Sequence, residues 1–186
     1  MRLMRQPDRV SVIIPTWNRL SLLKQCIASL LCQSWPDFEI LVVDDASPTD
    51  PSSIFKEMPR VRVLRNIENR GQAHSRNKDI DESTGDLLIF LDDDCRIDDT
   101  HWIEKHVQSH QEATDLLVGG KIHNIAVTWA GKARACLIRQ GIQFGGFLQT
   151  MNLSIRRGRY TTSVGLTNHS ENLKMWIFLC EPSAGG

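Results

Sequence analysis

Three consecutive carboxylates, Asp92, Asp93 and Asp94, are the residues of this 186-residue chain whose type and spacing most clearly suggest chemistry. They follow the apolar run L-L-I-F-L at 87–91, which has the length and content of a strand buried on both faces. Adjacent carboxylates repel one another, and a hard divalent cation, which takes oxygen ligands and often carries substrate phosphates, would relieve that repulsion. The sequence therefore indicates a cation site at this strand end, with a solvated turn as the alternative. If the backbone stays extended, Asp92 and Asp94 face one side and Asp93 the other.

Two further strands are expected to end at the same edge of a sheet. The apolar run 38–43 ends in Asp44 and Asp45, and the run 10–14 ends at Pro15, which is followed by the polar turn T-W-N with its large aromatic. In an open α/β sheet, ligands bind in the crevice outside the carboxyl ends of the strands. We therefore expect these three strand ends to border one ligand crevice.

The elements that must position these residues alternate along the chain. Apolar residues at helical spacing predict a helix over 20–34, and a short strand at 61–64 precedes a helix over 72–83. The run D-D-T at 98–100 is expected to cap a helix reaching about residue 113, and strands are expected at 116–122 and 151–155. This order predicts parallel β-α-β units with right-handed crossovers. We expect one α/β domain over 1–186, built on a doubly wound, mainly parallel sheet flanked by helices.

Composition narrows the class of partner and compartment. The chain has 22 basic and 22 acidic residues, so no overall field would attract nucleic acid, and any anion site must be local. Its five cysteines are scattered without a C-x-x-C pair, which argues against a disulfide framework or a zinc ribbon and favours a reducing compartment. No signal peptide or membrane span is evident. We expect a cytoplasmic protein, with peripheral contact at the inner face of a membrane left open.

Two groups of polar residues have ordinary structural interpretations. His106 and His110 are four residues apart on the helix expected after 98–100, and without a third ligand nearby they are expected to be surface histidines rather than a zinc pair. Arg156, Arg157 and Arg159 follow the expected strand at 151–155 and are expected to form a solvated edge.

Four motifs in order give the chain a family resemblance. They are V-S-V-I-I-P-T-W-N, I-L-V-V-D-D-A-S, E-N-R-G-Q-A-H-S-R-N and T-G-D-L-L-I-F-L-D-D-D. Together they strongly resemble the family 2 glycosyltransferases, which have the GT-A fold, a Rossmann-like arrangement. The resemblance is specific over residues 10–95, the expected nucleotide-sugar-binding half. It is weaker over 115–158 and poor after that, so the acceptor-side half, 115–186, would be incomplete, with a truncated C-terminus.

The resemblance implies roles in nucleotide binding. Pro15, Thr16 and Trp17 would lie against the base, with Trp17 stacking on it, and Asp45 would accept a hydrogen bond from the base's imide N–H. Arg76 would lie near the diphosphate. Two alternatives stay open: Trp17 packing under the sheet, and Arg76 as a solvated helix residue.

The three aspartates acquire roles from the same resemblance. Asp92 and Asp94 match the two acids of the family's D-x-D motif, which bind the ribose and, through a metal, the diphosphate. Asp93, between them, is included among the nucleotide-binding residues. The implied cofactor is Mn²⁺ or Mg²⁺, and a UDP- or dTDP-sugar is the favoured donor.

The resemblance further implies an inverting transfer to an unknown acceptor, a cell-surface polysaccharide, a lipid-linked glycan or a protein glycan. The family's general base is usually the second acid of an E-D pair, where this chain has Glu171 and Asn172. An amide cannot act as a base, so Glu171 is the expected catalytic residue. A nucleotide-sugar-binding domain with weak or no turnover is the alternative function. Nucleotidyl transfer on a related fold is a third, disfavoured because the Gly-rich signature of those enzymes is missing.

Overall fold

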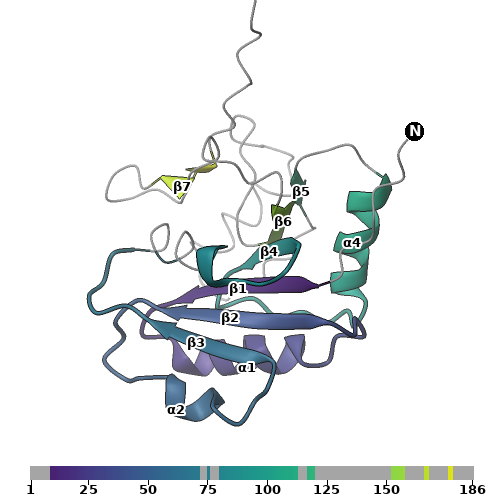
Figure 1. Ribbon diagram of the computed structural model, residues 1–186. Helices are drawn as coiled ribbons and strands as arrows, with labels where there is room; N and C mark the ends of the chain where they lie inside the picture. Colours follow the sequence, from purple (N-terminus) through teal and green to yellow (C-terminus); the bar gives the residue numbers. More distant parts are fainter. Residues whose placement is uncertain are drawn as a thin grey trace, which may run out of the picture.

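The computed structural model describes residues 9–71, 75, 80–112, 117–119, 152–157, 166–167 and 176–177. Six strands form one sheet in the order β3-β2-β1-β4-β6-β5, and two short strands, β7 and β8, form a separate antiparallel pair (Figure 1). The central strands β1, β2 and β4 are buried along their whole length. The predicted α/β fold with a mainly parallel sheet and flanking helices is confirmed.

The elements have the following bounds. The strands are β1 Val10–Thr16, β2 Phe38–Asp44, β3 Val61–Arg65, β4 Leu87–Leu91, β5 Leu117–Gly119, β6 Asn152–Arg156, β7 Leu166–Thr167 and β8 Trp176–Ile177. The helices are α1 Leu20–Leu30, α2 Ser52–Phe55 and α4 Trp102–Glu112.

The order of the strands creates a switch point between β1 and β4. The chain moves outward from β1 through β2 to β3, and then returns to place β4 on the other side of β1. The pairs β1–β2, β1–β4 and β2–β3 are all parallel, so the carboxyl ends of these four strands lie at one edge. Ligands bind at such switch points because the connections leave β1 and β4 in opposite directions and open a crevice between them.

Apolar side chains on the two faces of the sheet make two separate cores. Alternate residues of β1, β2 and β4 pack with α1 and α4 on one face, where Leu23, Ile27 and Ile103 are fully buried or nearly so. The residues between them, such as Ile13 and Phe90, pack with Ile80 and two residues of β6 on the other face. Burial on both faces explains why these strands read as continuous apolar runs in the sequence.

Some element boundaries differ from the sequence-based expectations, and one strand runs antiparallel to its neighbours. β1 continues through Pro15, which the ladder tolerates because β4 pairs with β1 only as far as Ile13. α1 ends at Leu30 rather than Ser34, because Ser34 leaves the helix to donate its N–H and hydroxyl to the carbonyl of Thr100, at 2.9 and 3.0 Å. β6 runs antiparallel to both β4 and β5, so the sheet is mixed on this side.

The prediction that His106 and His110 are surface residues is wrong. They are only 4 % and 2 % exposed, on the side of α4 that faces β6. His106 contacts Ser154 Oγ through Nδ1 at 2.8 Å and Asn152 Oδ1 through Nε2 at 2.9 Å, and His110 Nε2 lies 2.9 Å from the same Ser154 Oγ. The helix thus presents two imidazoles to the polar residues of β6. This burial could not be predicted from the sequence, because it depends on where β6 lies in the sheet.

The arginines after β6 do not form a solvated edge where the structure describes them. Arg157 is half-buried and donates to the carbonyls of Gly85, Ile80 and Ser83 at 2.8, 2.9 and 2.7 Å. Arg156 is also half-buried and donates to the carbonyl of His110 at 3.4 Å. Arg159 lies outside the described residues.

Gly85 lets this junction close tightly. A Cβ at this position would lie 2.5 Å from the backbone nitrogen of Ser11 and 2.8 Å from the carbonyl carbon of Val10. The Gly85 N–H instead donates to Ser11 Oγ at 2.8 Å. The start of β4 therefore approaches β1 more closely than any residue with a side chain would allow, at the sheet edge opposite the aspartates.

Candidate functional site

A side-chain hydrogen bond joins the carboxyl ends of β1 and β4 at the switch point. Thr16, the last residue of β1, donates its hydroxyl to Asp93 Oδ2 at 2.7 Å. Both residues are buried, Asp93 with only 4 % of its surface exposed. The two strand ends that the sequence singled out separately are therefore in direct contact, as the shared-edge argument predicts.

The three aspartates lie in a turn and not on an extended strand. β4 ends at Leu91, and the N–H of Cys95 donates to the carbonyl of Asp92 at 3.1 Å. The alternation of faces expected for an extended backbone therefore does not apply. Asp93 is buried, Asp92 is half-buried and Asp94 is exposed.

Arg19 brings two of these carboxylates together. Its Nη1 lies 3.3 Å from Asp93 Oδ1 and 3.3 Å from Asp94 Oδ2. Arg19 precedes the first turn of α1, so the helix that crosses from β1 to β2 delivers a cation to the end of β4. Arg19 was not among the predicted site residues, since its place directly after the T-W-N turn was the only signal.

Opposing influences act on the Asp93 carboxyl. Burial raises its pKa, and the hydrogen bond from Thr16 and the positive charge of Arg19 lower it, while the neighbouring charge of Asp94 raises it again. The net result is a pKa above the usual range for an aspartate. A further positive charge at this place would therefore stabilise the ionised form.

Asp45 holds the loop 66–71 against the end of β2. Its Oδ1 accepts hydrogen bonds from Asn66 Nδ2 at 2.8 Å and from the N–H of Arg70 at 3.0 Å, and its Oδ2 accepts from the N–H of Gly71 at 2.7 Å. A carboxylate has about four lone-pair sites, so one site on Oδ2 remains after these three bonds. Asp45 can therefore shape the crevice wall and still accept one hydrogen bond from a ligand.

The backbone at the crevice is unusual in three places. Asn18, Ala46 and Gly71 have φ angles of 54°, 61° and 84°, in the left-handed region. Glycine adopts this region freely and asparagine tolerates it, whereas alanine is strained there. All three positions follow or face the carboxyl ends of β1 and β2, which concentrates the tight turns of the fold at the site.

A pocket of ≈ 180 Å³ opens beside these turns. It is lined by Pro15, Thr16, Trp17, Arg19, Asp45, Asn69, Gly71 and Asp93. Trp17 is 51 % exposed, so the alternative that it packs under the sheet is wrong. The pocket thus combines an available aromatic face, a carboxylate with a remaining acceptor site and the edge of the aspartate turn.

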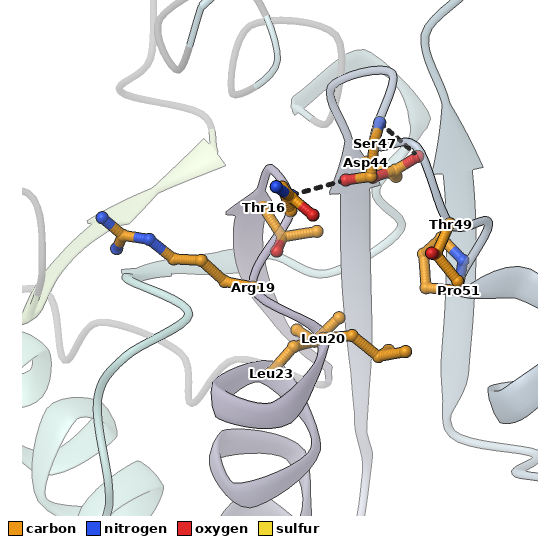
Figure 2. A pocket seen from close by; sticks show the side chains of 9 residues that line it. Thr16, Arg19, Leu20, Leu23, Asp44, Ser47, Thr49 and Pro51 are labelled. Carbon is orange, nitrogen blue, oxygen red and sulfur yellow. Dashed lines mark hydrogen bonds between the residues drawn. The ribbon is translucent and has the colours of Figure 1, made fainter.

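A smaller polar pocket of ≈ 50 Å³ adjoins the first on the side of β2 (Figure 2). Asp44 forms one wall, where its carboxylate accepts from the N–H of Ser47 and lies 3.1 Å from Arg65 Nη1. Ser47 Oγ accepts from the N–H of Asn18 at 2.7 Å, which ties the turn after β1 to the turn after β2. Thr16 and Arg19 line both pockets.

Two of the predicted site residues, Arg76 and Glu171, lie outside the described residues, so their roles stay predictions. The structure brings together Pro15, Thr16, Trp17, Asp45 and Asp93 around the larger pocket, with Asp94 joined to it through Arg19. Asn18, Ser47, Asn66 and Asn69 also belong to the site and were not predicted. In the described part of the chain, no helix is long and apolar enough to cross a membrane.

Comparison with known proteins identifies the class that this fold and site define. The sequence profile of glycosyl transferase family 2 matches residues 11–165, which is most of the chain. The chain therefore belongs to glycosyl transferase family 2.

Relatives by sequence are glycosyltransferases of archaea and bacteria. The chain is 28 % identical over 163 residues to glycosyltransferase AglE of Haloferax volcanii, a match that covers 80 % of this chain and 52 % of AglE. It is 36 % identical over 91 residues to the GalNAc(5)-diNAcBac-PP-undecaprenol beta-1,3-glucosyltransferase of Campylobacter jejuni, covering 46 % of this chain and 29 % of that enzyme. The chain thus spans about half the length of these relatives or less.

Solved structures show the same fold. The mannosyltransferase PcManGT of Pyrobaculum calidifontis, in complex with GDP-Man and Mn²⁺, superposes with a TM-score of 0.63 at 20 % identity, over 83 % of this chain and 46 % of that one. TarS 1–349 of S. aureus, in complex with UDP-GlcNAc, superposes with a TM-score of 0.57 at 24 % identity, over 64 % and 36 %. These are GT-A glycosyltransferases, and the chain shares their GT-A fold.

Proposed function

We propose that the protein transfers a sugar from a nucleoside diphosphate donor to a hydroxyl group of a glycan or lipid-linked acceptor. The observation that carries this proposal is the contact between Thr16 and Asp93 at the β1–β4 switch point, which places the aspartate turn beside the pocket of Trp17 and Asp45. A nucleotide whose base stacks on Trp17 and whose diphosphate lies at the aspartate turn would span the crevice. Family membership and the nucleotide-sugar complexes of the two structural neighbours support the same substrate class.

The base would be held by the Trp17 face and by Asp45. The remaining acceptor site on Asp45 Oδ2 suits the imide N–H of uracil or thymine, and three protein donors fix the orientation of this carboxylate. A UDP- or dTDP-sugar is therefore the proposed donor. Asn69, at the pocket wall, offers an amide for further contacts with the nucleoside.

The aspartate turn is the place that we propose for a divalent cation. No group of three or more His, Cys, Asp or Glu side chains in the described residues could hold a metal by itself. Asp93 and Asp94 nevertheless converge on a positive group, Arg19 Nη1, so two carboxylates are already arranged around one cation. We propose that Asp94 and Asp92 hold Mn²⁺ or Mg²⁺ once the donor's phosphate oxygens complete the ligand set.

The bound cation would supply neutralising charge for the diphosphate as it leaves. In the proposed inverting reaction the acceptor oxygen bonds to the anomeric carbon, the bond from that carbon to the diphosphate oxygen breaks with its electron pair, and Glu171 takes the acceptor's proton. A positioned carboxylate contributes 10²–10⁴-fold to such a step. Arg76, if it lies near the diphosphate as proposed, would add positive charge to the leaving group.

Donor turnover tests the proposal directly. Each sugar nucleotide of a panel is incubated with the protein, with and without Mn²⁺, and release of the nucleoside diphosphate is measured. Release that depends on Mn²⁺ is expected for a uridine or deoxythymidine donor. Donor binding without any release would favour the binding-domain alternative, and the absence of both would contradict the proposal.

Two substitutions test the general base. Glu171→Gln is expected to abolish transfer with donor affinity unchanged, because it removes the proposed proton acceptor and leaves the nucleotide pocket alone. Asn172→Asp is expected to raise the rate, because it places a carboxylate at the position that the family resemblance implies for the base. If Asn172→Asp and Glu171→Gln both leave the rate unaltered, the base has been assigned to the wrong segment.

A further inference from the structure

Arg19 makes two ion pairs, one with the buried carboxylate of Asp93 and one with the exposed carboxylate of Asp94. Asp93 is fixed from its other oxygen by Thr16, at 2.7 Å, and its side chain is only 5 % exposed. Asp94 and Arg19 are about half exposed, with side-chain values of 49 % and 51 %. Exposed ion pairs contribute little because water and salt screen them. Arg19 can therefore leave Asp94 at small cost, while Thr16 keeps Asp93 in place.

Arg19 is turned toward the aspartates and not toward the other nearby carboxylate. Asp44 lines the same small pocket, but Arg65 Nη1 lies 3.1 Å from it and already balances its charge. Figure 2 shows the Arg19 side chain extending away from Asp44 and Ser47. The guanidinium thus lies beside Asp93 and Asp94, with Nη1 at 3.3 Å from an oxygen of each.

We propose that Arg19 competes with the divalent cation for Asp94 and so makes cation binding depend on the nucleotide. In the nucleotide-free protein the guanidinium offsets part of the negative charge of the two carboxylates and repels a free cation. When a nucleoside diphosphate brings its own negative charge, Arg19 passes from Asp94 to a phosphate and the cation takes its place. Arg19 lines both pockets, so its side chain needs to turn only within the crevice to make this exchange.

This inference rests on the proposed function and adds that the cation and the nucleotide bind cooperatively. Binding of the cation and of the nucleotide strengthen one another by the same factor, because linkage is reciprocal. Without Arg19, Asp94 would be open to a free cation, which would then bind more tightly, and the mutual strengthening would shrink. Arg19 is thus a positioning residue that favours loading of the site by cation and donor together.

Titration with Mn²⁺, followed by the electron paramagnetic resonance signal of the free ion, tests the proposal without any turnover. Wild type, Arg19→Gln, Arg19→Lys and the control Arg96→Gln are each titrated with and without UDP. The control Arg96→Gln removes the same charge nearby. The Arg96 side chain is 70 % exposed and pairs with Asp98 instead of the turn aspartates. Arg19 makes no side-chain cap to α1, so its variants are expected to fold, which circular dichroism checks.

The proposal predicts that Arg19→Gln binds free Mn²⁺ several-fold more tightly than wild type, and that UDP strengthens Mn²⁺ binding by a smaller factor in this variant. Arg19→Lys, which keeps the charge, and Arg96→Gln should both behave like wild type. Unchanged affinity for free Mn²⁺ in Arg19→Gln, or an equal gain in Arg96→Gln, would overturn the proposal. If Arg19→Gln gains Mn²⁺ affinity but no variant binds UDP, the competition stands and the proposed nucleotide donor fails.

Discussion

Asp45 has both a structural role and a proposed binding role. Its carboxylate lines the pocket and also anchors the loop 66–71 through three hydrogen bonds. Before the structure, its only expected partner was the base of the nucleotide. The network explains why an acid is needed even without ligand: its two oxygens accept from two backbone N–H groups of the loop and from the buried Asn66 side chain. Changes at this residue should therefore affect both stability and nucleotide affinity.

Asp45→Asn is expected to destabilise the protein by about 1–3 kcal/mol, since the amide must turn its N–H₂ toward a backbone or side-chain N–H that now donates to the carboxylate. UDP affinity should fall with it, because the charge assistance to the imide is lost. Urea unfolding and calorimetric titration measure the two effects. Asp37→Asn, the same change at an exposed carboxylate, should stay within about 0.5 kcal/mol of wild type. Preferential binding of a guanosine nucleotide by the wild type would argue against this role.

Ala46 stores backbone strain directly after Asp45. Its φ of 61° costs an alanine about 1–2 kcal/mol, whereas glycine adopts it without a steric penalty. Ala46→Gly is therefore expected to raise the free energy of unfolding by up to about 1 kcal/mol, after the greater freedom of glycine in the unfolded chain is subtracted. Ala28→Gly, the same substitution within α1, should instead lower it by about 1 kcal/mol. A loss of stability at both positions would show that the turn is not strained.

At the scale of elements, α4 and β6 are joined by one consistent chain of hydrogen bonds. Trp102 Nε1 donates to Asn152 Oδ1 at 3.2 Å, and His106 Nε2 donates to the same oxygen. His106 Nδ1 is then the acceptor for the Ser154 hydroxyl, whose oxygen accepts from His110 Nε2. Nδ1 of His106 can accept this hydrogen bond only while His106 is neutral, whereas His110 Nε2 can donate in either protonation state.

The pKa of His106 is lowered to about 4, mainly by burial and in part by the neighbouring His110, against the opposing effect of the hydrogen bond to Asn152. Burial and the charge of Arg156 also lower the pKa of His110. The unfolded chain takes up protons near pH 6.5, so the stability present above that pH is lost as the pH falls toward 4. For His106 alone the loss is about 3 kcal/mol.

His106→Gln is accordingly expected to flatten the dependence of unfolding free energy on pH between 6.5 and 4, because one of the groups that titrate differently in the two states is gone. Urea unfolding at a series of pH values measures the slope. His101→Gln, at an exposed histidine just before α4, should keep the wild-type slope. An identical slope in both variants would show that the α4–β6 network does not control acid stability.

At the scale of the whole molecule, the sequence predicted the part of the fold that depends on local pattern. The apolar runs of β1, β2 and β4 and the carboxylates after them follow from burial on both faces of a parallel sheet, so these strands and their shared edge could be anticipated. The expected meeting of the strand ends is confirmed by the bond from Thr16 to Asp93.

Contacts between distant segments could not be anticipated in the same way. The burial of His106 depends on its contact with Asn152 of β6, 46 residues further along the chain. An exposed helix could have the same two histidines four residues apart, so the sequence pattern could not distinguish the two cases. Arg19 contacts Asp93, which is 74 residues away in the sequence. The sequence pattern did not show the direction of the turn that carries Asp93. The three donors to Asp45 come from a loop whose backbone path, with Gly71 at positive φ, is a property of the assembled crevice.

The aspartate turn at the end of β4 is proposed to hold a nucleoside diphosphate through a divalent cation. Calorimetric titration of UDP into the wild type and Asp94→Ala, each with Mn²⁺ and with excess chelator, tests it most directly. We expect binding by the wild type that disappears with the chelator, and no measurable binding by Asp94→Ala, because the diphosphate charge loses its cation. Equal UDP affinity in the two proteins, or wild-type binding that survives the chelator, would contradict the claim.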